Sequence, residues 1–273
     1  MSILFKVKFA LTAAGFAMTI GTLGWLGAIS AADAQAILNQ RQGPKLTIWT
    51  FDYPQDLTFL KDESSTQIAY LAGHARIVEG RVYFRRNKKT LKIPTQMSKF
   101  PVIRVETAGK IKNEAIDPLV KVFLDEVKRS GAKKLQVDFD AREDERQFYA
   151  SFLQKLKENL TVASLADVKI SITALASWSL EPDFLPSVVD ERVLMLFSMG
   201  KDEDKVLAAL SNKIAGQSGG DALCLGIGTF EGAVNEKIGR LFPKCRNWYV
   251  FNAHSWSEAS YARAKKLVKT LSR

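Results

Sequence analysis

Short runs of β-branched and aromatic residues recur along the chain from residue 46, and most are followed by a segment of helical period. Strands alternate their side chains between two faces, whereas helices repeat apolar residues every three or four positions. The pattern predicts eight strands, at 46–52, 66–73, 101–107, 133–140, 168–175, 192–199, 222–229 and 247–254.

Helices are predicted between most of these strands. The first has a single apolar stripe and stops at Gly131, because glycine commonly terminates helices. Only the short segment 181–189 connects strands five and six, and residues 74–86 have the pattern of an inserted β-hairpin. The predicted helices are 114–131, 144–160, 202–216, 231–242 and 257–272.

Eight strands that alternate with helices predict an α/β fold, a single parallel (β/α)8 barrel of the TIM type, over residues 46–273. The length of this segment suits one such domain. An open doubly wound sheet is the alternative, and it is less favoured because no Gly-rich phosphate loop follows the first strand.

The N-terminal residues have a different character. Lys6 and Lys8 precede the charge-free run 9–29, and small residues follow at 30–36. A basic start, an apolar middle and a small-residue end are typical of a secretory signal peptide, although 21 apolar residues could also span a bilayer. We therefore expect 1–36 to be a signal peptide or a membrane anchor, residues 37–45 to be a linker, and the barrel to be periplasmic or extracellular.

The whole chain carries a formal charge of +10. Loss of residues 1–35 removes Lys6, Lys8 and Asp33, which leaves +9. A basic surface suits nucleic acid, anionic lipid or acidic glycan, but an exported protein rarely meets nucleic acid. The densest basic run, 81–89, is interpreted as a solvated hairpin. We expect no nucleic-acid partner and no membrane contact beyond the N-terminal segment; the oligomeric state stays open.

Two cysteines occur, Cys224 and Cys245. In an exported protein such a pair is compatible with a disulfide. The flanks of Cys224 are those of a buried strand, where an inert thiol is equally common. Both interpretations remain open from the sequence.

Polar residues gather where the predicted strands end, which in a barrel is the mouth that carries the chemistry. Parity orients them: Leu135 and Val137 face the helices, so Asp138 and Asp140 face the barrel axis. Arg104 faces inward on the neighbouring strand and is expected to hold Asp138 as a structural anion. Asp140 is expected either to act at the rim or to cap the next helix. The other candidates near strand ends are Asp52, Trp178, Glu231, Asn252, His254 and Trp256.

The segments "LQVDFDA" (135–141) and "ISITALASW" (170–178) resemble the bacterial family known as domain of unknown function 3142. The likeness covers roughly residues 46–256 and is strongest over strands three to six. The family has no assigned activity, and the resemblance implies a barrel related to sugar-processing enzymes.

The chain is also distantly similar to the chitinase-like family 18 glycoside hydrolases, whose fourth strand ends in D-x-x-D-x-D-x-E. If Asp138 and Asp140 match the last two aspartates, Arg142 stands where that family has its general acid. Arginine cannot donate a proton at useful pH. Glu143 is one residue away from the acid position, and Leu135 replaces the first aspartate. The similarity therefore implies this architecture with its chemistry altered or lost.

Carboxylates on strands four and seven could serve as acid and nucleophile of a retaining glycosidase, and Asp140 and Glu231 occupy those places. Glu231 is equally suited to stabilise the start of its helix. Trp178 and Trp256 offer flat faces for sugar stacking, or plug the barrel. Asp52, Arg104, Asn252 and His254 are the remaining candidates for substrate binding.

Other chemistries fit the residues less well. The chain has two histidines, too few for a typical zinc site, and no G-x-S-x-G nucleophile elbow. We expect no metal and no cofactor. The sequence predicts an exported, glycoside-hydrolase-like barrel that acts on an envelope or extracellular glycan through Asp138, Asp140 and Glu231. The alternative is a barrel that has lost its acid and binds a glycan or an envelope partner without turnover.

Overall fold

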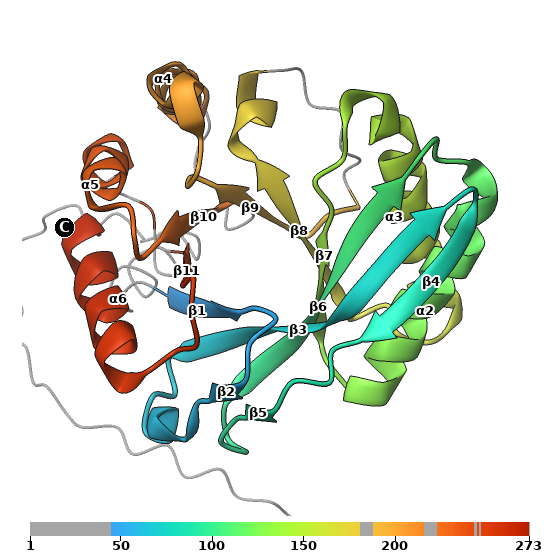
Figure 1. Cartoon of the computed structure of the whole chain (residues 1–273), viewed down its shortest axis with the longest axis horizontal. Coiled ribbons are helices and arrows are strands. Elements are labelled where there is room, and N and C mark those ends of the chain that lie inside the picture. Colours follow the sequence, from blue (N-terminus) through green and yellow to red (C-terminus); the bar gives the residue numbers. More distant parts are fainter. Residues whose placement is uncertain (1–44, 181–187, 216–222, 243–244, 246, 273) are drawn as a thin grey trace, which may run out of the picture. The chain divides into compact units, whose positions relative to one another are not determined.

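The computed structural model describes residues 45–180, 188–215, 223–242, 245 and 247–272, and it confirms the predicted barrel. Eight parallel strands of this part pair in sequential order, and β1 pairs with both β3 and β11, which closes the ring (Figure 1). The barrel strands are β1 (Lys45–Thr50), β3 (Thr66–Val78), β6 (Ser98–Ala108), β7 (Lys134–Asp138), β8 (Lys169–Leu175), β9 (Glu191–Met195), β10 (Leu223–Gly228) and β11 (Asn247–Phe251).

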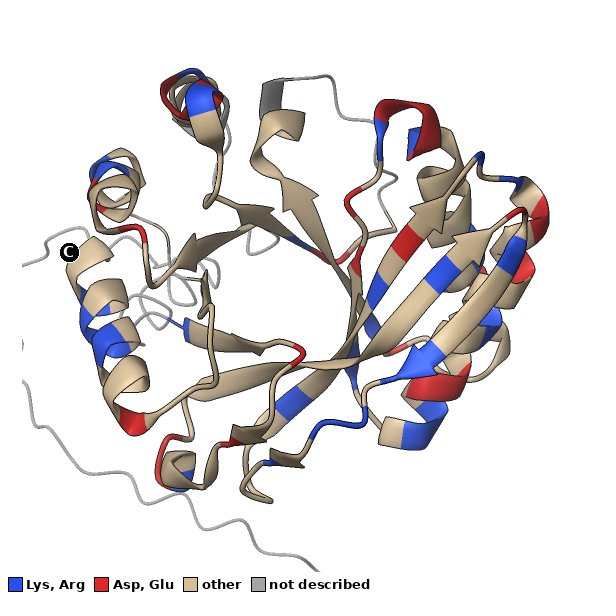
Figure 2. Ribbon diagram, viewed as in Figure 1, with Lys and Arg blue, Asp and Glu red and all other residues tan. Residues whose placement is uncertain are grey.

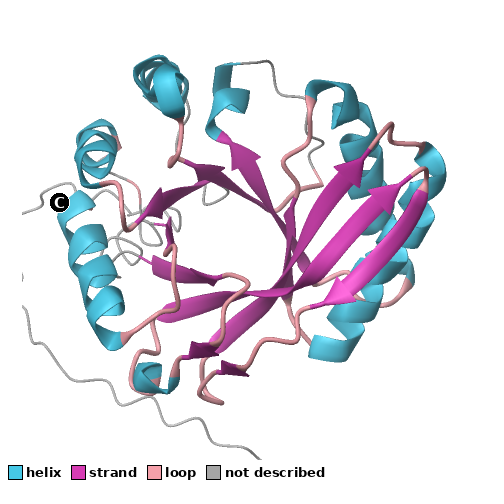
Figure 3. Ribbon diagram, in the orientation of Figure 1, coloured by secondary structure: helices cyan, strands magenta, loops and turns pink. Residues whose placement is uncertain are grey.

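The helices lie outside the ring of strands (Figure 3). They are α2 (Ile116–Ser130), α3 (Arg146–Val162), α4 (Glu203–Ala215), α5 (Gly232–Leu241) and α6 (Glu258–Leu271). Gly131 ends α2 in the left-handed conformation (φ 64°), and its N–H donates to the carbonyl of Val127, as the sequence predicted. Short 3₁₀ turns complete the described connections: η1 (Thr58–Leu60), η2 (Asn113–Ala115), η3 (Glu143–Glu145), η4 (Ala176–Leu180) and η5 (Gly200–Asp202).

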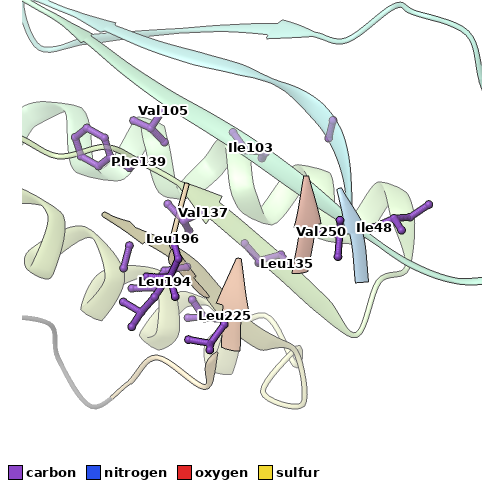
Figure 4. Packing of buried hydrophobic residues seen from close by; sticks show 14 of the residues in the cluster. Ile48, Ile103, Val105, Leu135, Val137, Phe139, Leu194, Leu196, Leu225 and Val250 are labelled. Carbon is purple, nitrogen blue, oxygen red and sulfur yellow. The ribbon is translucent and has the colours of Figure 1, made fainter. Parts of the chain in front are cut away.

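The main hydrophobic core lies between the strands and the helices. Leu135, Val137 and Phe139 point outward into it, together with residues of like parity on the neighbouring strands (Figure 4). Complete burial of such side chains contributes about 1.5–3 kcal/mol each. Because these residues point outward, the side chains at the alternate positions of the strand, such as Asp138, point to the barrel axis.

A smaller cluster fills the barrel itself and includes Trp49, Phe100, Val193 and Tyr249. Beneath it, Lys134 lies 3.3 Å from Glu191 and 4.0 Å from the ring centre of Phe100. These contacts compensate a charge that is largely buried at the bottom of the barrel.

The predicted hairpin is present, but its first arm is the continuation of a barrel strand. β3 runs to Val78, and β4 (Arg81–Arg86) pairs with it antiparallel. The register with β6 shifts between Leu71 and Gly73, which marks a β-bulge. Outside the barrel, β2 (Gln55–Asp56) and β5 (Leu91–Lys92) form a minimal two-stranded ladder.

No disulfide joins Cys224 to Cys245 in the structure, although the sequence allowed one. Cys224 belongs to the cluster inside the barrel, whereas Cys245 packs against the core on the helical side.

The predicted signal or anchor segment, 1–36, lies outside the described residues, as do 37–44 of the linker and 181–187. Among the residues that are described, no helix is both long enough and apolar enough to cross a membrane.

Candidate active site at the barrel mouth

A cavity of about 330 Å³ opens at the C-terminal ends of the barrel strands. This volume lies at the lower end of the range for small-molecule sites. Charged side chains reach it from β6, from the end of β7 and from η5, and aromatic residues reach it from the ends of β1, β9 and β11. Its lining comprises Trp49, Phe51, Arg104, Asp138, Asp140, Leu175, Ala176, Ser177, Met195, Phe197, Ser198, Met199, Asp202, Val206 and Phe251.

The sequence-predicted pairing of Arg104 with Asp138 is confirmed. Nη1 of Arg104 lies 3.4 Å from Oδ2 of Asp138, and Nη2 lies 3.5 Å from Oδ2 of Asp140. Thr173 on β8 donates to the other carboxylate oxygen of Asp138 at 2.9 Å. One guanidinium thus bridges two carboxyl groups that leave the same face of β7, as the strand parity predicted.

The two carboxyl groups differ in exposure. Asp138 is buried, and this desolvation raises its pKa from 3.8 to about 6, against the opposing effect of Arg104. The side chain of Asp140 is 40% exposed, and its pKa is also raised, mainly by desolvation. A carboxyl group with a raised pKa keeps its proton closer to neutral pH, which suits a proton donor.

An aromatic wall, defined here as Phe51, Phe197 and Phe251, lines the same cavity as these carboxyl groups. Phe197 and Phe251 stack with their rings 5.3 Å apart and nearly parallel, and Phe51 meets the edge of Phe251 at 5.8 Å. The guanidinium of Arg104 lies 5.6 Å from the ring centre of Phe51, so the wall and the charged side meet there.

Arg142, which the sequence motif aligns with the family 18 acid, does not line the cavity. Its guanidinium pairs with Glu145 at 2.8 Å and donates to the carbonyl of Gly109 at 3.3 Å. Glu143 and Asp144 are exposed on η3, and neither lines the cavity. The N-cap of η3 is Arg142, so the structure gives Asp140 no capping role there.

Glu231 does not line the cavity, but it contacts a residue that does. Its Oε1 accepts the backbone N–H of Ser198 at 2.8 Å. Ser198 lines the cavity and has a left-handed backbone (φ 55°), which a non-glycine residue adopts only at some cost. Glu231 is also the N-cap residue of α5, without a side-chain capping bond. These contacts support the loop after β9.

The remaining candidates lie around the mouth and not in the cavity. Trp256 is 4% exposed and donates from Nε1 to the carbonyl of Trp49, so its ring packs in the core. Trp178 is 8% exposed and packs against the ring of Tyr149. Asn252 accepts from Thr229 and donates to the carbonyl of His254, whose side chain is exposed. The aromatic residues that line the cavity are Trp49, Phe51, Phe197 and Phe251, and the predicted Trp178 and Trp256 are not among them.

Asp52 belongs to a second polar group at the rim. His74, on the part of β3 beyond the bulge, lies 3.7 Å from Asp52 through Nε2 and 3.7 Å from Glu106 through Nδ1. Glu106 in turn lies 3.5 Å from Arg104, which connects this group to the cavity. Within the described residues, no group of three or more His, Cys, Asp or Glu side chains is arranged to hold a metal ion.

Sequence reasoning missed the phenylalanines and Asp202 of the cavity. Phe197 and Phe251 have the inward parity of their strands, so alternation could have identified them. Asp202 comes from η5, and no local pattern places that turn over the mouth.

The fold is that of chitinase-like barrels. A protein of Streptomyces coelicolor described as chitinase A matches with a TM-score of 0.60 and 11% identity, over 84% of this chain and 98% of that one. The catalytic domain of a family 18 chitinase from the fern Peteris ryukyuensis matches with a TM-score of 0.54 and 10% identity, over 84% and 100%. A class V chitinase from Nicotiana tobaccum, in complex with NAG4, matches with a TM-score of 0.50 and 11% identity, over 85% and 98%.

No family model and no curated protein matches the chain, so the resemblance to the domain of unknown function 3142 is not confirmed. At such low identities the structural likeness shows a shared barrel fold and no shared activity.

Proposed function

We propose that this protein is an exported carbohydrate-active barrel that binds the end of an envelope or extracellular glycan in its mouth. In this proposal the aromatic wall packs against a sugar face, and Asp140 acts as a proton donor on the bound sugar. Asp138 and Arg104 position Asp140 and set the charge around it.

One observation supports the proposal most strongly. A partly exposed carboxyl group with a raised pKa and a stacked aromatic surface face the same cavity. Aromatic faces suit the apolar faces of sugar rings, and a protonated carboxyl group can donate to a glycosidic oxygen.

The structural neighbours point to the same class of ligand. Those proteins are chitinases by name, and one of them is described in complex with NAG4. A glycan is therefore the first ligand to test. Export is supported by the basic, apolar and small-residue sequence of 1–36, which is the pattern of a signal peptide or anchor.

Glycan binding without turnover is the second candidate function, and Arg142 favours it. The residue at the family 18 acid position cannot donate a proton, and it is tied to Glu145 away from the cavity. If Asp140 does not replace the missing acid, the mouth would retain a sugar without cleaving it.

The deciding experiment is a glycan screen of the protein lacking residues 1–36, read for both binding and release of reducing ends. Release that is lost in Asp140→Asn would support the hydrolase. Saturable binding without release would select the binding function, and the absence of both would refute the proposal.

A further inference from the structure

Three strands extend beyond the barrel mouth. β3 and β6 continue past the level at which β1 and β7 end, and β4 adds to the outer side of β3. One face of this extension, which carries Ala75, Ile77 and Val105, packs into the main core. The other face continues the inner surface of the barrel out of the mouth.

The β-bulge of β3 determines which side chains this face carries. Before the bulge, Ala69 and Leu71 pair with the inward residues of β6, whereas beyond it His74 pairs with Arg104. The extra residue reverses the parity, so His74 and Arg76 point to the mouth side. Gly73 permits the bulge, because a Cβ there would lie 2.6 Å from the carbonyl oxygen of Arg85.

The face beyond the bulge is basic. We define the basic wall as Arg76, Arg81, Tyr83 and Arg85, all of which are exposed. Tyr83 is 55% exposed and pairs in register with Arg76 across the hairpin. Figure 2 shows Lys and Arg positions along β3 and β4. Among the described residues, no ion-pair partner lies within 4.0 Å of Arg76 or Arg81, so these guanidinium groups are available to a ligand.

The basic wall is continuous with the cavity. His74 pairs in register with both Arg85 and Arg104, so these three side chains stand side by side on one face. Arg85 reaches to 3.9 Å from Asp52 at the end of β1, and Arg104 lines the cavity itself. Glu106 is the acid on this face of β6, and it is already engaged by Arg104 and His74.

We propose that the basic wall binds the carboxylate groups of an acidic glycan whose end occupies the cavity. This inference rests on the proposed function and names its substrate class. Guanidinium groups bind carboxylates through paired N–H donors, and the exposed ring of Tyr83 offers a sugar a stacking surface between them. The cavity has room only for the end of a glycan, so the remaining sugars of a longer chain lie outside it. The basic wall contacts these sugars and therefore confers the preference for acidic chains.

The experiment compares two oligosaccharides of equal length, the acidic hyaluronan hexasaccharide and neutral chitohexaose, by titration calorimetry at low salt. The test variant carries Arg76→Gln, Arg81→Gln and Arg85→Gln. The control variant carries Lys128→Gln, Lys155→Gln and Lys266→Gln, which remove the same charge from exposed positions on α2, α3 and α6. Thermal melts confirm that both variants fold.

We expect the wild type to bind hyaluronan more tightly than chitohexaose, and the wall variant to bind hyaluronan about tenfold more weakly. Its affinity for chitohexaose, and the affinity of the control variant for both, should stay within about twofold of wild type. Equal affinity of the wild type for the two sugars, or an unchanged affinity of the wall variant for hyaluronan, would overturn the inference while leaving the proposed function intact. Tighter binding to a thymidine tetranucleotide of equal charge would show general polyanion binding and would also overturn it. If neither sugar binds, this inference falls, and the glycan screen decides separately whether the proposed function falls with it.

Discussion

The guanidinium of Arg104 lies 3.4 Å from the carboxyl group of Asp138, yet the pKa of Asp138 is raised to about 6. Burial therefore outweighs the attraction of the arginine. The desolvation penalty of a buried charge often exceeds the electrostatic attraction of a single partner. Arg104 also divides its attraction between Asp138, Asp140 and Glu106. Asp138 is consequently a group that titrates in mildly acidic solution and not a permanent structural anion.

The first prediction concerns folding stability and pH. A carboxyl group with a higher pKa in the folded state binds more protons when folded, so its contribution to stability grows as the pH falls from above 6 toward 3.8. The free energy of unfolding of the wild type, relative to Asp138→Asn, should rise by about 1 kcal/mol between pH 7 and pH 5. Chemical denaturation of both proteins at the two pH values measures this difference. If the free energy of unfolding of the wild type relative to Asp138→Asn instead falls at low pH, the attraction of Arg104 outweighs burial in setting the pKa of Asp138.

Asp140→Asn should fold normally and lose function. The side chain is partly exposed, so we expect a stability change of less than about 1 kcal/mol. If Asp140 donates a proton, the rate of glycan cleavage should fall about 100-fold or more. Since its pKa is raised, wild-type activity should persist to a higher pH than an ordinary aspartic acid would allow.

Glu143→Gln is the matched control for that variant, because Glu143 is exposed and lies next to the family 18 acid position. It should retain activity within about twofold. The opposite result, an inactive Glu143→Gln with an active Asp140→Asn, would transfer the role of the acid to η3.

The aromatic wall should contribute to affinity, whereas the buried tryptophans should contribute to stability. Phe51→Ala should weaken glycan binding about threefold to tenfold, from the loss of one stacking contact. Trp256→Ala should instead lower the free energy of unfolding by about 3–5 kcal/mol, because its ring is buried and its Nε1 donates to Trp49. Calorimetric titration and thermal melts of both variants separate the two effects. Equal loss of affinity in both would restore Trp256 as a binding residue.

Glu231 offers a test between a nucleophile and a structural acceptor. Glu231→Gln keeps an oxygen that can accept the N–H of Ser198, so a structural role predicts nearly full activity. Glu231→Ala leaves that N–H without its partner and should cost about 1–3 kcal/mol of stability. Kinetic measurements and thermal melts of the two variants distinguish these roles. If Glu231 is the nucleophile, either substitution should abolish activity.

The cysteines should remain reduced. Thiol titration of denatured, unreduced protein should count two reduced thiols, because no disulfide joins Cys224 to Cys245 in the structure. In the native protein Cys224 should react slowly, since burial raises the pKa of its thiol. A count below two would show a disulfide.

The sequence by itself determined the barrel and the identity of its charged side. Strand parity is local, since side chains alternate whatever the neighbours do, so Leu135 and Val137 fixed the inward direction of Asp138 and Asp140. The same alternation on β6 placed Arg104 beside them.

Only the tertiary structure decided the rest of the site. The bulge before Gly73 reverses the parity of β3, and it depends on close packing against β4, which no local pattern encodes. Burial likewise separated Trp256, which packs in the core, from Phe251, which lines the cavity, although the two aromatic residues lie only five positions apart at the end of β11 and in the connection to α6. The pKa of Asp138 depends on how much water its neighbours exclude, and that is a property of the assembled barrel.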